Sequence, residues 1–128
     1  MHLAQLRAEN FRLFQGLSLQ PHRRLNLVLG ANAAGKTSLL EAIYCLARAK
    51  SFRSSSPAEL AGKGQRGWVV SGEFQEPDRP PTLAGVSWDA KGTQVRRNRE
   101  PAGTRDLVRR LPVQIMERGM HRLLQQGP

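Results

Sequence analysis

The residues best suited to chemistry lie in one short stretch, "GANAAGKTS", which fits the phosphate-binding loop pattern G-x-x-x-x-G-K-[ST]. In this motif backbone N–H groups point into a concave turn that holds phosphate oxygens, and bulky side chains would block the approach. The predicted nucleotide-binding residues are Gly30, Ala31, Asn32, Ala33, Ala34, Gly35, Lys36, Thr37 and Ser38.

The polar residues of this loop have distinct expected roles. Lys36 places a positive charge on the outer phosphates, and the Thr37 hydroxyl is the expected metal ligand, for Mg²⁺. Asn32 is also a residue type that tolerates unusual backbone angles. The helix predicted from Lys36 directs its positive N-terminal end at the same phosphates. The loop therefore predicts a nucleotide site that uses Mg²⁺.

A strand and a helix flank the loop, as this chemistry requires. The run "RLNLVLG", residues 24–30, is almost continuously apolar, which predicts a strand covered on both faces. From Lys36 to Ala49 the apolar residues recur on one wide helical face. Cys45 lies in the middle of that helix and is interpreted as a small buried hydrophobe rather than a nucleophile.

A β-hairpin is predicted before the loop. Its first strand runs from Leu3 to Phe11, with Leu6 among its core positions, and its turn is expected at Gly16, before a short strand at residues 17–19. After the helix, the basic residues Arg48, Lys50 and Arg53 could contact DNA or complement the helix C-terminus.

The second half of the chain is predicted to be rich in β-structure. Ser56 and Pro57 indicate a helix start. A strand is expected at residues 68–74 and a hairpin at residues 83–97, with residues 89–92 at its tip and Trp68 and Trp88 in the core. Residues 98–104 form an expected turn, residues 105–111 a short helix and residues 112–116 a last strand.

The charge favours an anionic partner only weakly. The net charge is +10, and 16 of the 20 basic residues are arginine, a residue suited to phosphates. A genome whose base composition favours arginine codons explains this excess equally well. Six arginines between residues 96 and 110 would form a DNA-binding stripe if they shared one face, although such runs are more often solvated surface. They are Arg96, Arg97, Arg99, Arg105, Arg109 and Arg110.

Compartment signals are limited. No apolar run approaches 18 residues, so no membrane span is expected. The N-terminus does not have the pattern of a signal peptide. A single cysteine fits a reducing cytosol, so a cytoplasmic protein is expected.

Three quoted stretches together carry a family resemblance: "AENFRLF", "GANAAGKTS" and "SLLEAIY" running into "SFR". They resemble the RecF family of bacterial recombination mediators, within the RecF/SMC group of ABC-type ATPase heads. The resemblance covers the whole chain and is most specific from Leu25 to Arg53. The family usually has a proline and an acidic residue where Arg118 and Gly119 stand here, so the geometry of that loop is an open question.

The resemblance implies an α/β fold, an incomplete phosphate-loop ATPase head of the ABC type, with an N-terminal hairpin, a phosphate-loop strand and helix, and a β-rich second half. Residues 1–128 would be the N-terminal part of one such domain. RecF-like proteins bind ATP, form homodimers with ATP between the subunits, bind single-stranded or gapped DNA, and help load the recombinase with other mediators. They serve DNA repair, recombination, replication and the SOS response. Arg12 would lie near the nucleotide or be an exposed strand-end residue.

Hydrolysis is expected to be weak in the full-length form and absent in this chain alone. In such heads the carboxylates that hold Mg²⁺ and activate water lie in the second half of the protein. Asp78, Asp89 and Asp106 all fall in predicted loops or at a helix start. An unrelated phosphate-loop NTPase or kinase and an inactive truncated remnant are the alternatives. A guanine-reading N/T-K-x-D sequence is absent, which disfavours a GTPase.

Overall fold

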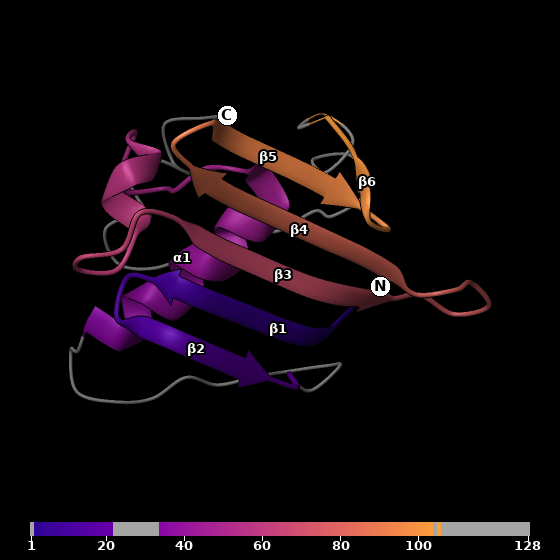
Figure 1. The fold of residues 1–128 in the computed structure, drawn as a ribbon. Coiled ribbons are helices and arrows are strands. Elements are labelled where there is room, and N and C mark those ends of the chain that lie inside the picture. Colours follow the sequence, from indigo (N-terminus) through magenta and orange to yellow (C-terminus); the bar gives the residue numbers. More distant parts are fainter. Residues whose placement is uncertain (1, 22–33, 104, 106–128) are drawn as a thin grey trace, which may run out of the picture.

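The computed structural model describes residues 2–21, 34–103 and 105. In this part of the chain six strands form one antiparallel sheet, in the order β2-β1-β3-β4-β5-β6, with α1 against one face (Figure 1). The elements are β1 (His2–Phe11), β2 (Phe14–Leu19), α1 (Ala34–Arg48), the 3₁₀ helix η1 (Pro57–Leu60), β3 (Trp68–Gln75), β4 (Thr82–Asp89), β5 (Gly92–Arg97) and β6 (Glu100–Pro101).

The sheet is amphipathic because alternate residues of a strand point to opposite faces. On β3, Trp68, Val70, Gly72 and Phe74 are buried while the residues between them are exposed or half-buried. The same alternation continues on the neighbouring strands. One face of the sheet is therefore apolar, and α1 covers it.

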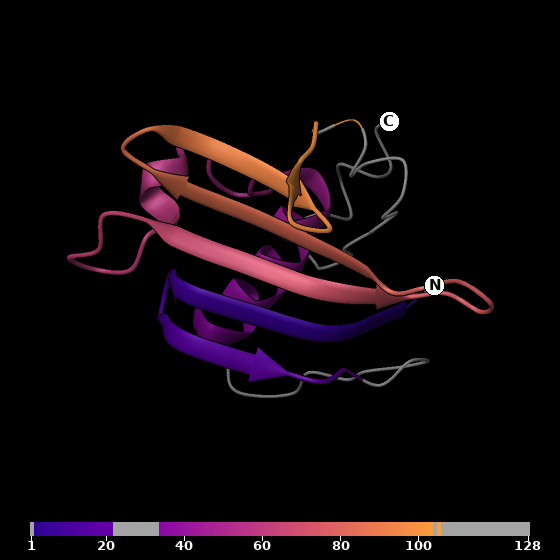
Figure 2. The same cartoon turned by 45° about the vertical axis from the view of Figure 1, so that its right-hand side comes forward.

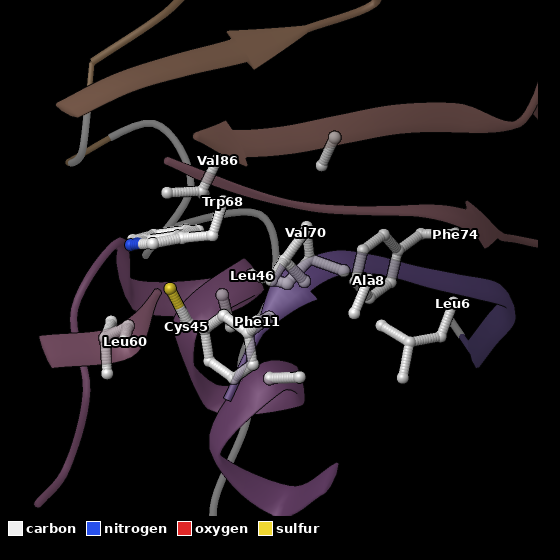
Figure 3. Packing of buried hydrophobic residues seen from close by; sticks show 13 residues of the cluster. Leu6, Ala8, Phe11, Cys45, Leu46, Leu60, Trp68, Val70, Phe74 and Val86 are labelled. Atoms are coloured by element: carbon white, nitrogen blue, oxygen red, sulfur yellow. The ribbon is translucent and has the colours of Figure 1, made fainter. Parts of the chain in front are cut away.

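The core forms where α1 meets this apolar face (Figure 3). Phe11 and Trp68 pack edge to face, with ring centroids 5.4 Å apart. Cys45 is fully buried, and burial, followed by the negative charge of Glu41, raises the pKa of its thiol to about 12. The cysteine is a neutral packing residue, which confirms the prediction from the helical pattern.

The first hairpin turns earlier than predicted. Phe11 pairs with Phe14, so Arg12 and Leu13 form the turn, and Gly16 lies inside β2 opposite Glu9. A tertiary contact holds this position, because the Arg12 N–H donates to the Leu60 carbonyl at 2.8 Å. The predicted turn at Gly16 was therefore wrong.

The segment after α1 also departs from its prediction. Pro57 does open a helical turn, but that turn is a four-residue 3₁₀ helix and the Ser56 side chain makes no capping hydrogen bond. Ala61 then forms an isolated antiparallel bridge with Phe11, which ends the helix. A contact with β1 thus overrides the local capping signal.

Downstream, the predicted strand and hairpin are confirmed. Asp89 pairs with Gly92 at the hairpin tip, as expected. Where only a turn was predicted, Asn98 and Arg99 make a tight turn and residues 100–101 form β6. The predicted elements at residues 24–30 and 112–116 lie outside the described residues, as does the predicted helix at 105–111 apart from Arg105. No helix within the described ranges is long and apolar enough to cross a membrane.

Gly72 lies on β3 beneath Leu46 of α1 and beside the backbone of β1, so the fold predicts a steric requirement for glycine. A Cβ there would lie 2.6 Å from Leu46 Cδ2 and 2.8 Å from the Gln5 carbonyl oxygen. We expect Gly72→Ala to lower the free energy of unfolding by about 1–3 kcal/mol, because the Leu46 side chain and the backbone at Gln5 must shift to make room for the Cβ. Denaturant unfolding of this chain measures the change.

Gly16→Ala is the matched control for this experiment. Gly16 also lies within a strand, but a Cβ there would meet nothing within 4 Å. Its replacement should leave stability unchanged or raise it by up to about 1 kcal/mol. Equal effects of the two substitutions would contradict the close packing assigned to Gly72.

Candidate functional site

The helix α1 begins at Ala34, within the predicted phosphate-binding loop and two residues earlier than expected. Its first turn carries no acidic side chain, so the positive end of the helix dipole is not neutralised from within the turn. Thr37 is half-buried and Ser38 is 1% exposed. Of Ala34, Gly35 and Lys36 only the backbone is described, and Gly30, Ala31, Asn32 and Ala33 lie outside the described residues.

One turn further along α1 stands a carboxylate with no exposed surface, that of Glu41. The Arg12 guanidinium donates to both of its oxygens, from Nε to Oε1 at 2.8 Å and from Nη2 to Oε2 at 2.9 Å. This two-point geometry is the strongest form of a carboxylate–guanidinium pair. It joins the turn between β1 and β2 to the helix.

A second arginine reaches the same carboxylate from the segment that follows α1. Arg53 Nη2 donates to Glu41 Oε1 at 2.9 Å and to Ser38 Oγ at 3.2 Å. The Ser51 hydroxyl donates to Glu41 Oε2 and in turn accepts the Arg53 N–H at 3.0 Å. Arg53 is therefore turned back along the helix toward Ser38 instead of capping the helix end, and contacts of Arg48, Lys50 and Arg53 with DNA stay predictions.

These contacts control the charge of the Glu41 carboxyl group. Burial by itself raises its pKa, but hydrogen bonds from Arg12, Arg53 and Ser51 outweigh burial and lower the pKa from 4.5 to about 2. The hydrogen bond to Glu41 likewise raises the pKa of Arg12, against the effect of burial. The Arg12–Glu41–Arg53 cluster thus carries two positive charges and one negative charge at neutral pH.

The excess positive charge lies beside the start of α1. The side chains of Arg12 and Arg53 are 24% and 34% exposed, so neither is fully buried. Arg53 contacts Ser38 directly. A helix N-terminus next to a net-positive cluster is an environment that favours a bound anion.

The sequence reasoning missed Glu41 and Ser51. A signal was present, because Glu41 shares the apolar face of the helix with Ala42 and Cys45. A charged residue in such a stripe requires a buried partner. One of the two predictions for Arg12 was an exposed position at the end of the strand. Its side chain is instead partly buried and forms an ion pair with Glu41.

The predicted arginine stripe is divided by the sheet. Arg97 pairs with Ala84, whose side chain faces α1, whereas Arg96 pairs with Gly85, so the two arginines point to opposite faces. Arg105 is exposed, and Arg109 and Arg110 lie outside the described residues. The six arginines therefore do not form one continuous face, and their contacts with DNA stay predictions.

Three aspartates were considered, and rejected, as candidates for a catalytic carboxylate. Asp78 lies in an exposed turn and Asp89 at the exposed end of β4, while Asp106 falls outside the described part. Within the described residues no group of three or more His, Cys, Asp or Glu side chains is placed to hold a metal ion. Thr37 remains the predicted Mg²⁺ ligand.

The fold is that of an ATPase head, and the predicted phosphate-binding loop leads into the start of α1. The family model described as "AAA domain" matches residues 5–80, and the chain belongs to that family. Its described part is an incomplete phosphate-loop ATPase head, as the family resemblance implied.

The particular proteins to which the chain is similar are RecF proteins. It is 37% identical over 127 residues to the DNA replication and repair protein RecF of Hydrogenovibrio crunogenus, covering 98% of this chain and 35% of the relative. It is 35% identical over 128 residues to RecF of Desulforudis audaxviator, covering 100% of this chain and 35% of the relative. The chain thus spans about a third of the length of these curated relatives.

Solved RecF structures give the same result. The chain matches the recombination mediator protein RecF-ATP of the RecFOR pathway with a TM-score of 0.86 and 26% identity, over 99% of this chain and 36% of that one. It matches the RecF-ATPrS structure with a TM-score of 0.76 and 28% identity, over 83% and 29% of the two chains. The suspected resemblance to RecF is confirmed.

The buried carboxylate predicts an acid-sensitive stability. Because the folded-state pKa of Glu41 is lowered, its contribution is fully present above about pH 4.5 and is lost as the pH falls toward 2. We expect Glu41→Gln to lower the free energy of unfolding at pH 7 by about 2–4 kcal/mol, because two guanidinium groups lose their counter-ion. The variant should also lack this part of the acid dependence, as measured by denaturant unfolding between pH 2 and 7.

Glu9→Gln is the control for the loss of one carboxylate. Glu9 lies on β1 with an exposed side chain, so its replacement should leave both the stability and its acid dependence close to wild type. Retention of the full wild-type acid dependence in Glu41→Gln would show that another group causes it.

Proposed function

We propose that residues 1–128 are the N-terminal part of one ATPase head domain of a RecF-like DNA repair protein, and that the full-length form binds ATP with Mg²⁺. One observation carries this proposal: the G-x-x-x-x-G-K-T motif leads into the start of α1, next to the net-positive Arg12–Glu41–Arg53 cluster. The similarity to RecF along the whole chain supports ATP as the nucleotide. It also disfavours an unrelated phosphate-loop kinase.

In this proposal each residue of the loop acts through ordinary phosphate chemistry. Backbone N–H groups of residues 30–35 surround the phosphates, Lys36 neutralises their outer charge, and the Thr37 hydroxyl ligates Mg²⁺. Bound Mg²⁺ would neutralise phosphate charge. Glu41 acts as a positioning residue, because it holds both Arg12 and Arg53, and Arg53 contacts Ser38.

The wider activity is also proposed from the family. The relatives are named DNA replication and repair proteins, and the solved neighbours are recombination mediators of the RecFOR pathway. We propose that the full-length protein is cytoplasmic, forms an ATP-dependent homodimer, binds single-stranded or gapped DNA and helps load the recombinase together with other mediators. DNA recombination and the SOS response to DNA damage are the processes that it would serve.

The nucleotide proposal is tested by Lys36→Ala in the full-length form. Removing a charge-assisted contact to phosphate should cost about 1.5–3 kcal/mol of binding free energy, or roughly ten- to a hundredfold in affinity for ATP with Mg²⁺. Isothermal titration calorimetry measures the change. Lys63→Ala, at an exposed loop position, is the control and should bind as wild type. Unchanged affinity in Lys36→Ala would contradict the assignment.

Hydrolysis is a separate prediction. The 128-residue chain alone should release no phosphate from ATP above the background rate, because it lacks a recognisable water-activating carboxylate. A coupled phosphate assay with the purified chain measures this rate. Turnover that disappears in Lys36→Ala would instead reveal a catalytic acid within these residues.

A further inference from the structure

The face of the sheet that turns away from α1 carries a regular arrangement of charge. Figures 1 and 2 show α1 behind the sheet, so this outer face is toward the viewer. Across it one row runs from strand to strand, because Arg7 pairs with Ser71, Ser71 with Gly85, and Gly85 with Arg96. Arginines thus stand at both ends of the row, and two small residues stand between them.

The small residues leave a hollow. A groove of about 450 Å³ lies over Ser71 and Gly85, and Arg7, Arg96 and Arg99 are among the side chains that line it. Because neighbouring strands are about 4.8 Å apart, the backbones of the two end arginines lie about 14 Å apart across three strand spacings. The groove therefore runs across β1, β3, β4 and β5 and not along any one strand.

The groove carries a net positive charge, and its arginines are free to bind an anion. Its lining contains the three arginines and one carboxylate, Glu73, which gives a formal net charge of +2. None of Arg7, Arg96 and Arg99 forms a salt bridge or side-chain hydrogen bond with another described residue, in contrast to Arg12 and Arg53. The three guanidinium groups can therefore bind an anion without breaking an internal ion pair within the described part.

Arg99 is held in an unfavourable backbone conformation. Asn98 and Arg99, with φ of 53° and 69°, form the two-residue turn between Arg97 and Glu100. Such turns prefer glycine at the second position. Asn98 suits the first position, because its Oδ1 accepts the Leu83 N–H at 2.9 Å. An arginine at a strained backbone position that also lines a basic groove points to a use for its side chain.

We propose that this groove binds the sugar–phosphate backbone of a single DNA strand, an inference that rests on the proposed function of the full-length protein as a DNA-binding protein. Arginines at both ends and at the rim match an extended polyanion rather than one isolated phosphate. The lining contains no aromatic side chain on which bases could stack. Recognition is therefore through the backbone and is independent of base sequence.

The test compares two triple variants of the 128-residue chain by fluorescence anisotropy with a labelled 20-nucleotide oligothymidine. Arg7→Gln/Arg96→Gln/Arg99→Gln removes the groove charges, and it should weaken binding at least tenfold. It should also flatten the slope of log affinity against log salt by about 2, since each phosphate contact on a single strand contributes about 0.7.

The matched control removes three positive charges elsewhere. Lys63→Gln/Arg66→Gln/Arg79→Gln alters exposed residues that do not line the groove, and it should change affinity by less than about threefold because exposed charges at a distance are screened. Equal weakening by both variants would contradict the proposal that the groove is the binding site. It would show instead that DNA binding depends on the overall charge of the chain. No binding by the wild-type chain at low salt would count against DNA binding itself.

Arg99→Gly separates a binding role from a structural one. Glycine relieves the positive φ, so the variant should have a higher Tm than wild type but a lower affinity for the oligonucleotide. Its salt slope should flatten by about 0.7. A higher Tm with unchanged affinity and slope would contradict the role proposed for Arg99.

Discussion

The buried carboxylate of Glu41 is the constraint on which the arrangement of this chain depends. A carboxylate without exposed surface is stable only when charged donors surround it. Its donors come from two separate segments: Arg12 from the turn between β1 and β2, and Ser51 and Arg53 from the segment after α1. The charge can therefore be satisfied only when the hairpin, the helix and the following loop are all in place.

This requirement links the fold to the candidate nucleotide site. Arg53, the second arginine bound to Glu41, also contacts Ser38 at the end of the phosphate-loop motif. Since two guanidinium groups share one carboxylate, a positive charge remains next to the helix N-terminus. In the proposed function, this structural ion-pair network contributes to the electrostatics of the phosphate site.

The two faces of the sheet serve different purposes because side chains alternate along each strand. Val70 and Phe74 face α1 and exclude water from the core. Ser71 and Gly85 face outward on the opposite surface. Because both residues are small, a groove forms above them, and arginines from different strands border it. The same alternation places the adjacent arginines of β5 on different faces.

The sequence by itself determined the features that depend on local periodicity and turn chemistry. These include the helix that follows the phosphate-binding loop, the buried positions of Cys45 and Trp68, and the hairpin tip between Asp89 and Gly92. Such features follow from the spacing of apolar residues and from residues that tolerate tight turns. The motif and its flanking pattern also indicated the family.

Only the tertiary structure decided which distant groups meet. Arg12 and Glu41 are 29 residues apart, and no local pattern pairs them. The turn formed at Arg12 and Leu13 rather than at Gly16 because the Leu60 carbonyl accepts a hydrogen bond from Arg12. The outer groove likewise depends on strand register, which brings Arg7 and Arg96 into one row only after β1, β3, β4 and β5 have paired.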